Sequence, residues 1–187
     1  MIRCLALFLL APLAASAQTA AATPKPPETL RGVVLAQLHS THDREEWFVP
    51  ISTAIDNLTP EQAKWVPTNA AGKLDPNANH SVGQLANHLL IWNTIELARF
   101  NGEKPKAPSD NDETFNSFDA VSWSATVQKL NAILAAWEQA VQNADDAKLA
   151  ANAYLVAHVG AHNAYHVGQI LYVRKLQGAW DPAKGVK

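Results

Sequence analysis

Histidines near the C-terminal end of the chain are the residues whose types and spacing could support chemistry. Three of the seven histidines, His158, His162 and His166, follow one another at intervals of four within residues 155–176. Nothing in this run breaks a helix, and successive helical residues are rotated by about 100°, so the three imidazoles would share one face. That face comprises Leu155, His158, His162, His166, Gln169, Val173 and Leu176. We therefore expect one helix that buries its histidines.

Buried imidazoles need polar partners, and two explanations meet that need. An unpaired polar group in an apolar interior costs on the order of 1–3 kcal/mol. A shared divalent metal ion is one partner, because two histidines one turn apart, roughly 6 Å along the axis, can aim at a single point. In the alternative, each histidine hydrogen-bonds a neighbouring carbonyl or side chain. The residues of this run alone leave both explanations open.

A second segment offers another inward histidine. Ser81 and Gln84 have the spacing of a capping box, so we expect a helix over 81–101 that ends before Gly102. His88 lies among apolar residues on the inward face of this helix. A third metal ligand donated from an opposite helix would occupy such a position.

The N-terminal third of the domain predicts a helix with one unexpected residue. Residues 29–58 show apolar side chains at helical spacing, with a kink or interruption at Pro50. Glu45 falls on the stripe that this helix would bury. His39 and His42 flank the stripe, and we expect them to be solvated or half-buried.

A fourth helix is expected to be structural. It begins at Ser122 or Ser124, ends near residue 143 and shows no inward ligand. Because only residues 143–148 link it to the last helix, we expect these two helices to be antiparallel neighbours. Together the four helices predict an all-α four-helix bundle over residues 28–180.

The first seventeen residues have the pattern of a secretory signal peptide. Arg3 precedes an apolar run over 4–15, which ends in the small residues before Gln18. The run is shorter than the roughly 20 residues of a membrane span. We therefore expect a secreted or periplasmic protein with no stable membrane insertion after cleavage, a flexible tether over 18–27 and a tail over 181–187.

Charge and cysteine content exclude several functions for the mature chain. Removing residues 1–17 takes away Arg3, Cys4 and no acidic residue, which leaves 14 basic and 17 acidic side chains and a net charge of −3. This balance does not attract nucleic acid. No cysteine remains for a disulfide or a thiol nucleophile.

Three segments, in order, resemble the DinB-like superfamily, which includes the YfiT-like metal-dependent hydrolases. They are LTPEQAKWVP, SVGQLANHLLIWN and HNAYHVGQILYVRKLQG, and the similarity covers about residues 30–180. The resemblance implies an up-down-down-up order of the helices and a homodimer. It makes His88, His162 and His166 the metal ligands and leaves His158 outside the triad. It also matches Gly168, where a small residue would let a neighbouring helix approach closely.

Three neutral ligands would leave a divalent ion with open positions, as in catalytic sites. Our first hypothesis is therefore metal-dependent hydrolysis or transfer on a small molecule. Zn or Ni is expected because imidazole suits both. Glu45, Glu96 and His158 are the candidate general bases, in that order. Metal should leave near and below pH ~6.5, where free imidazole protonates.

Two other functions fit the same residues. The first is a non-enzymatic metal-binding protein of the cell envelope, since the chain shows no recognisable substrate motif. The second is a thiol-dependent S-transferase, because some members of the family resemble such enzymes. Low-molecular-weight thiols are cytoplasmic reductants, so the expected export of this chain weighs against that reading.

Overall fold

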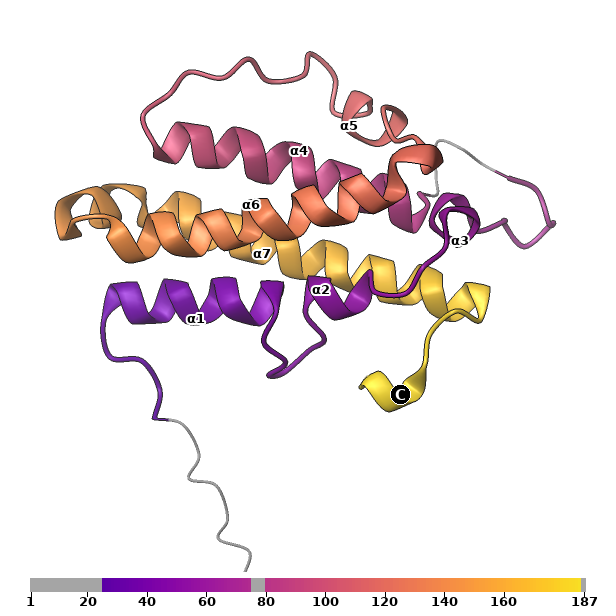
Figure 1. The fold of residues 1–187 in the computed structure, drawn as a ribbon, viewed down its shortest axis with the longest axis horizontal. Coiled ribbons are helices and arrows are strands. Elements are labelled where there is room, and N and C mark those ends of the chain that lie inside the picture. Colours follow the sequence, from indigo (N-terminus) through magenta and orange to yellow (C-terminus); the bar gives the residue numbers. More distant parts are fainter. Residues whose placement is uncertain (1–24, 75–79, 186–187) are drawn as a thin grey trace, which may run out of the picture.

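The computed structural model describes residues 25–74 and 80–185, and its regular elements within these ranges are helices (Figure 1). The bundle consists of α1 (Leu30–His42), α4 (Val82–Phe100), α6 (Trp123–Asn143) and α7 (Asp146–Gln177). Short helical segments lie in the connections and at the C-terminal end: α2 (Ile51–Ala54), α3 (Pro60–Lys64), α5 (Glu113–Asn116), η1 (Ala120–Ser122) and η2 (Pro182–Lys184). The predicted all-α class is confirmed.

Two of the sequence-based expectations concern the ends of the chain. The expected signal peptide, residues 1–17, and residues 18–24 of the expected tether lie outside the described residues. Among the helices within those ranges, none combines the length and the apolarity that crossing a membrane requires. Near the C-terminus, Lys184 of the expected tail pairs with Asp56, with Nζ 2.9 Å from Oδ2.

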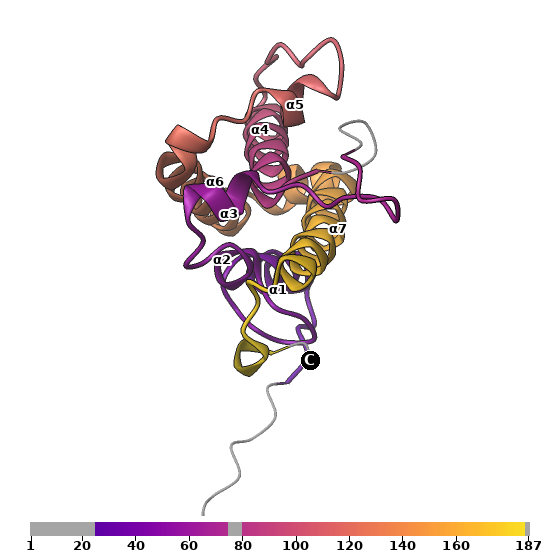
Figure 2. The same cartoon turned by 90° about the vertical axis from the view of Figure 1, so that its right-hand side faces the viewer.

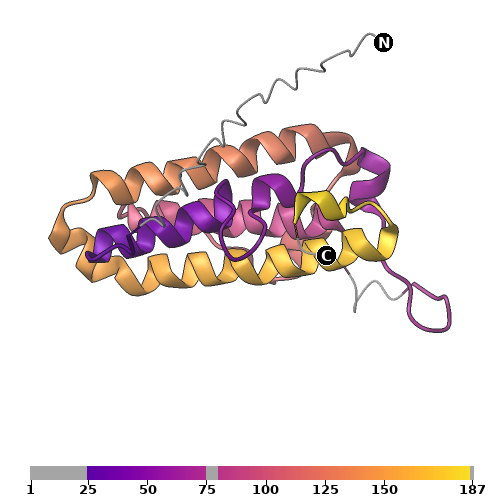
Figure 3. The same ribbon diagram turned by 90° about the horizontal axis from the view of Figure 1, so that it is seen from below.

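The four long helices occupy the corners of a square, with α1 opposite α4 and α6 opposite α7 (Figure 2). Seen from below, α1 lies between α6 and α7 and packs on both (Figure 3). The prediction that α6 and α7 are neighbours is therefore wrong. A short link fixes only the distance between the two helix ends that it joins. Over the rest of their lengths, each of these helices packs on α1 and α4.

Contacts between helices give their relative directions. Arg31, at the start of α1, pairs with Asp146, at the start of α7, so these helices run the same way. Its guanidinium also donates to the Val141 carbonyl near the end of α6, at 2.6 Å, so α1 and α6 run in opposite directions. Lys148, early in α7, lies over the ring of Phe100 at the end of α4, so α4 and α7 are also antiparallel.

The first helix ends earlier than predicted. The backbone amides of Asp43 and Arg44 both donate to the His39 carbonyl, at 3.1 and 2.9 Å, and this bifurcation ends α1. Pro50 is the N-cap of α2 and does not kink a continuous helix. Glu45 lies in the connection between them and is exposed, so the expected burial of this carboxylate is wrong.

Capping groups define other helix ends, and the capping box predicted at Ser81 is confirmed. Thr59 and Gln62 form a capping box at the start of α3, and Ser81 and Gln84 form one at the start of α4. In each box the hydroxyl accepts from a backbone amide and the amide side chain accepts from the cap residue. Gly178, with φ of 71°, caps the end of α7 in the left-handed conformation.

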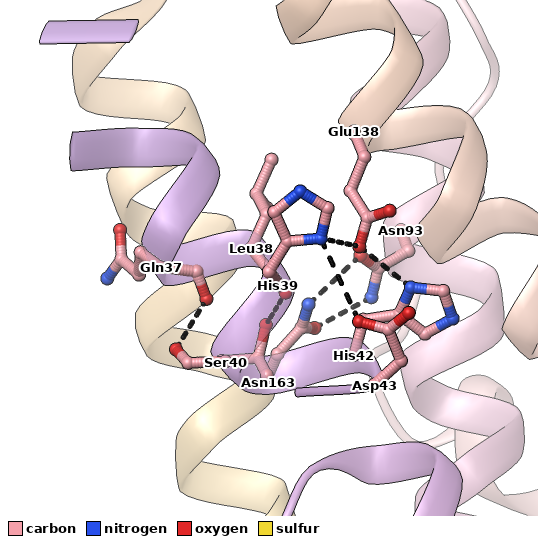
Figure 4. A network of polar contacts seen from close by, with 10 residues as sticks. Gln37, Leu38, His39, Ser40, His42, Asp43, Asn93, Glu138 and Asn163 are labelled. Carbon is pink, nitrogen blue, oxygen red and sulfur yellow. Dashed lines mark hydrogen bonds and ion pairs between the residues drawn. The ribbon is translucent and has the colours of Figure 1, made fainter. Parts of the chain in front are cut away.

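Buried polar side chains fix how α4 and α7 pair. Asn93 of α4 and Asn163 of α7 are both buried, and Asn93 Nδ2 donates to Asn163 Oδ1 at 2.8 Å (Figure 4). The indole of Trp137, fully buried on α6, donates to the Asn93 carbonyl at 3.0 Å. Because a slip of either helix would leave these groups unpaired in the core, the pair sets the register.

Two glycines differ sharply in their surroundings. A Cβ built on Gly83, in the first turn of α4, would overlap the ring of Phe118. One built on Gly168 would meet no atom within 4 Å. The expectation that Gly168 lets a neighbouring helix approach is therefore wrong. Gly83 has the close neighbour.

These two glycines form a matched pair of substitutions. Gly83→Ala should lower the free energy of unfolding by about 1–3 kcal/mol, because the half-buried Phe118 ring packs directly on this glycine and must move. Gly168→Ala should raise it by roughly 0.5–1 kcal/mol, because alanine favours an open helix position. Urea unfolding of both variants measures the difference. Equal changes of the same sign would contradict the packing described for Gly83.

Candidate metal centre

Three imidazoles meet between α4 and α7. His88 Nε2 and His166 Nε2 each lie 3.0 Å from His162 Nε2. One ligand atom from each of the three residues lies within 4.8 Å of the other two. His88 and His166 are buried, and His162 is half-buried. The structure thus brings together the three histidines that the family resemblance selected, in a group that could hold a metal ion.

The partner of His88 fixes which of its ring nitrogens carries the proton. His88 Nδ1 lies 2.6 Å from Thr114 Oγ1. The Thr114 hydroxyl donates its only proton to the Asn111 carbonyl, at 2.6 Å. Its oxygen must therefore accept a hydrogen bond from His88 Nδ1–H. In the neutral ring, Nε2 then carries a lone pair directed at the other histidines.

His166 is held in the same tautomer. Its Nδ1 lies 2.6 Å from Gln169 Oε1, an amide oxygen that can only accept. In the same orientation the amide Nε2 donates to the Tyr165 hydroxyl, at 3.2 Å. The proton of neutral His166 is therefore on Nδ1. Its Nε2 also presents a lone pair.

Two lone pairs thus converge on the Nε2 atom of His162, which can donate at most one proton. At least one of the 3.0 Å contacts between nitrogens therefore has no hydrogen in it. A cation shared by the three nitrogens would turn this repulsion into attraction. Zinc binds imidazole nitrogen at about 2.0–2.1 Å, and nickel also accepts imidazole ligands. The donor set therefore fits a divalent ion.

Burial keeps these imidazoles neutral. Desolvation, followed by the charges of His166 and His162, lowers the pKa of His88 to about 3. Desolvation and the charge of His162 lower the pKa of His166 to about 4, against the hydrogen bond that its ring donates to Gln169, which raises it. Burial also lowers the pKa of His162. Since protons compete less well here than for free imidazole, we now expect metal to leave below, not near, pH ~6.5.

The triad forms part of the wall of a cavity of about 790 Å³. Aromatic side chains contribute much of the remaining wall: Trp92, Phe115, Tyr154 and Tyr165. Ionisable groups outside the triad are also present: His80, Glu96, Asp112 and His158. A space of this size, with mostly apolar walls and a few polar groups, is typical of small-molecule sites.

The candidate general bases are distributed unevenly around this cavity. His158 lines it but is exposed and packs against Tyr154, with ring centroids 4.2 Å apart. The expected burial of His158 is therefore wrong, because its side chain is exposed although it lines the cavity. Glu96 lines the cavity and pairs with Arg99. Glu45 is not among the lining residues.

Sequence reasoning missed two residues of the site. Thr114 lies in α5, within a segment that reads as a polar loop, yet it is fully buried against His88. His80 lines the cavity and stacks on Phe115, with ring centroids 3.9 Å apart, and Phe115 stacks on His88 at 4.1 Å. Burial lowers the pKa of His80 against the opposing charge of Asp112. The one available signal was an aromatic residue, Phe115, within an acidic loop.

Thr114→Val should weaken metal binding by about 10–100-fold, because it removes the acceptor that fixes the His88 tautomer. Thr126→Val is the matched control: Thr126 is also buried, but its hydroxyl donates to the carbonyl of Ser122, the N-cap of α6, away from the histidines. Calorimetric titration with Zn²⁺ compares the two proteins. Equal affinity would contradict the positioning role of Thr114.

In the metal-free protein, the free energy of unfolding should fall as pH decreases from about 6.5. The lowered pKa values of His88 (about 3) and His166 (about 4) mean that the unfolded chain binds more protons throughout this interval. The stability is complete above pH ~6.5 and is lost as pH falls toward the folded values. Urea unfolding at neutral and mildly acidic pH measures the slope. If the free energy of unfolding of the His88→Ala/His166→Ala double variant depended on pH as strongly as that of the wild type, these histidines would not be the cause.

Comparison with known proteins gives one match. The family model described as the DinB superfamily matches residues 51–170, which include all three histidines of the triad. Searches of curated proteins and of solved structures found no significant match. The family model spans well over half of the 187 residues. Its match agrees with the helical bundle and the triad already described, and the chain belongs to the DinB superfamily.

Proposed function

We propose that this protein is a metal-dependent enzyme that hydrolyses a small molecule, or transfers a group on it, within the cavity beside the triad. His88, His162 and His166 would hold the ion, Zn²⁺ or Ni²⁺. The observation that carries the proposal is the convergence of two tautomer-fixed lone pairs on a third imidazole at 3.0 Å. Three neutral protein ligands also leave positions open to a substrate, unlike a closed structural site.

The cavity walls suggest the kind of substrate. The bound ion would supply Lewis-acid chemistry, polarising a carbonyl or related oxygen. Trp92, Phe115 and Tyr165 would bury an apolar or aromatic portion of the substrate and exclude water from it. We therefore favour an ester, amide or similar compound that joins an apolar group to a polar, electrophilic one.

His158 is the residue that we assign to proton transfer. It lines the cavity, lies outside the triad and is exposed, so a substrate or water can reach it. Glu96 is less suited because Arg99 pairs with its carboxylate. His80 is less suited because its Nδ1 is enclosed. Glu45, in the connection after α1, is outside the cavity walls.

We further propose that the protein acts outside the cytoplasm. Support comes from the sequence of residues 1–17, with Arg3, an apolar run and a small-residue end. An exported location also favours hydrolysis over transfer to a low-molecular-weight thiol.

His158 and His162 lie on adjacent turns of α7, and substituting each in turn tests metal binding and catalysis separately. His162→Ala should lose the ion of the triad and all turnover, because one of three ligands is gone. His158→Ala should keep that ion and lose turnover, because only the proton acceptor is removed. Elemental analysis of untagged protein measures metal binding, and a panel of esters, amides and thiol adducts measures turnover.

Unchanged metal binding by His162→Ala would show that the triad is only a polar core. A metal-loaded wild type that turns over none of the panel would favour a non-enzymatic metal-binding role.

A further inference from the structure

A second group of potential metal ligands lies between α1 and α6, the edge of the bundle opposite α4 and α7 (Figure 2). His39 and Asp43 are one turn apart at the end of α1, and Glu138 faces them from α6 (Figure 4). One ligand atom from each lies within 4.8 Å of the other two. None of the three lines the cavity beside the triad. This group is therefore a separate site.

This group of residues could not be predicted from helical periodicity. The helix expected to end near residue 143 shows no inward ligand in its sequence pattern, but the Glu138 side chain of α6 is only 14 % exposed and faces α1. His42 was expected to be solvated or half-buried, and it is buried. Periodicity missed both because they lie beside the apolar stripes of α1 and α6, where the two helices meet.

The distances within the group suit a shared ion. His39 Nδ1 lies 3.1 Å from Glu138 Oε1 and 3.8 Å from Asp43 Oδ1. This Nδ1 atom is buried and has no hydrogen-bond partner, because its approach to the carboxylate lacks hydrogen-bond geometry. A buried nitrogen that points at two carboxylates without hydrogen-bonding to them is placed as a ligand atom would be.

His42 plays a different part. Its Nδ1 lies 2.8 Å from the same Glu138 oxygen and has hydrogen-bond geometry, so the imidazole donates to the carboxylate. Donors of this kind orient carboxylate ligands from outside the coordination sphere. His42 therefore holds Glu138 in the direction of His39 and Asp43.

The charges around Glu138 also favour a bound cation. In the part of the chain that the structure describes, the ion pairs of Glu138 are with His39 and His42, and no lysine or arginine joins them. Asp43 and Glu138 bring two carboxylates into this group, and their partners in it are imidazoles. The C-terminal end of α1 adds partial negative charge at the same point. A divalent ion would offset all three.

We propose that His39, Asp43 and Glu138 bind a divalent transition-metal ion, with His42 holding Glu138 in place. One imidazole and two carboxylates form a donor set that Zn²⁺ and Mn²⁺ both accept. The ion would tie the end of α1 to α6 where the chain leaves the helix. His39 and Asp43 precede residues 51–170, so they lie outside the part of the chain that the family model matches.

Zinc titration of the full chain, without an affinity tag, tests the proposal. Wild type should bind two equivalents, Glu138→Gln one and His162→Ala one, whereas the double variant should bind none. Zinc should raise the unfolding midpoint of His162→Ala and leave that of the double variant unchanged. Asp146→Asn is the control, because it also removes a carboxylate paired with α1 but lies outside the group.

The loss of one equivalent on Glu138→Gln, in either background, supports the second site whatever the triad does. Equal stoichiometry and affinity in wild type and Glu138→Gln would overturn the proposal and reduce the group to an ion pair. If Glu138→Gln does not fold, His39→Ala and Asp43→Asn decide, since both side chains are partly exposed. Each should weaken zinc binding in the His162→Ala background at least about tenfold. Unchanged affinity in both would contradict the site.

Discussion

The convergence of the His88 and His166 lone pairs on His162 Nε2, at the interface of α4 and α7, is the constraint on which the rest of this structure depends. His88 and His166 reach that point only if the two helices keep one register, and the buried pair Asn93–Asn163 fixes it. They present lone pairs there only because Thr114 and Gln169 bind their other ring nitrogens. The segment between α4 and α6 therefore belongs to the site, although it is not part of the bundle.

Holding neutral imidazoles in this way opposes folding in acid and favours metal binding. Desolvation and mutual repulsion lower the pKa of His88 and of His166, so a proton is a weak competitor for their nitrogens. The group around Glu138 differs in its ligand atoms, with two carboxylates beside one imidazole in place of three converging imidazoles. If both bind metal, the bundle carries an open site on one edge and a clamp on the other, each with its own ligand chemistry.

Much of the fold could be predicted from the sequence because its signals are local. The spacing of His162 and His166 and the capping box at Ser81 depend on helix geometry alone, and both predictions agree with the structure. The predictions were wrong where contacts between distant segments determine where a helix ends or which helices pack together. Glu45 left the predicted helix because the chain turns after His42, and the diagonal placement of α6 and α7 is set by packing, not by their short link.

The outer parts of the site could not be predicted for the same reason. Thr114 meets His88 across 26 residues of chain, and nothing local to an acidic loop indicates which of its side chains will be buried. His158 shares the helical face of the triad, but periodicity cannot tell where along that face the protein ends and the cavity opens. Spacing and the family resemblance therefore pointed to the three histidines of the triad but not to the residues that hold or surround them.

Nitrogen-detected NMR of the histidine side chains tests the central claim most directly, because it reports which ring nitrogen carries the proton. In the metal-free protein at neutral pH, His88 and His166 should both be protonated at Nδ1. Addition of Zn²⁺ should then shift the Nε2 resonances of His88, His162 and His166 together. Protonation at Nε2 in His88 and His166, with no joint shift on addition of Zn²⁺, would contradict the account.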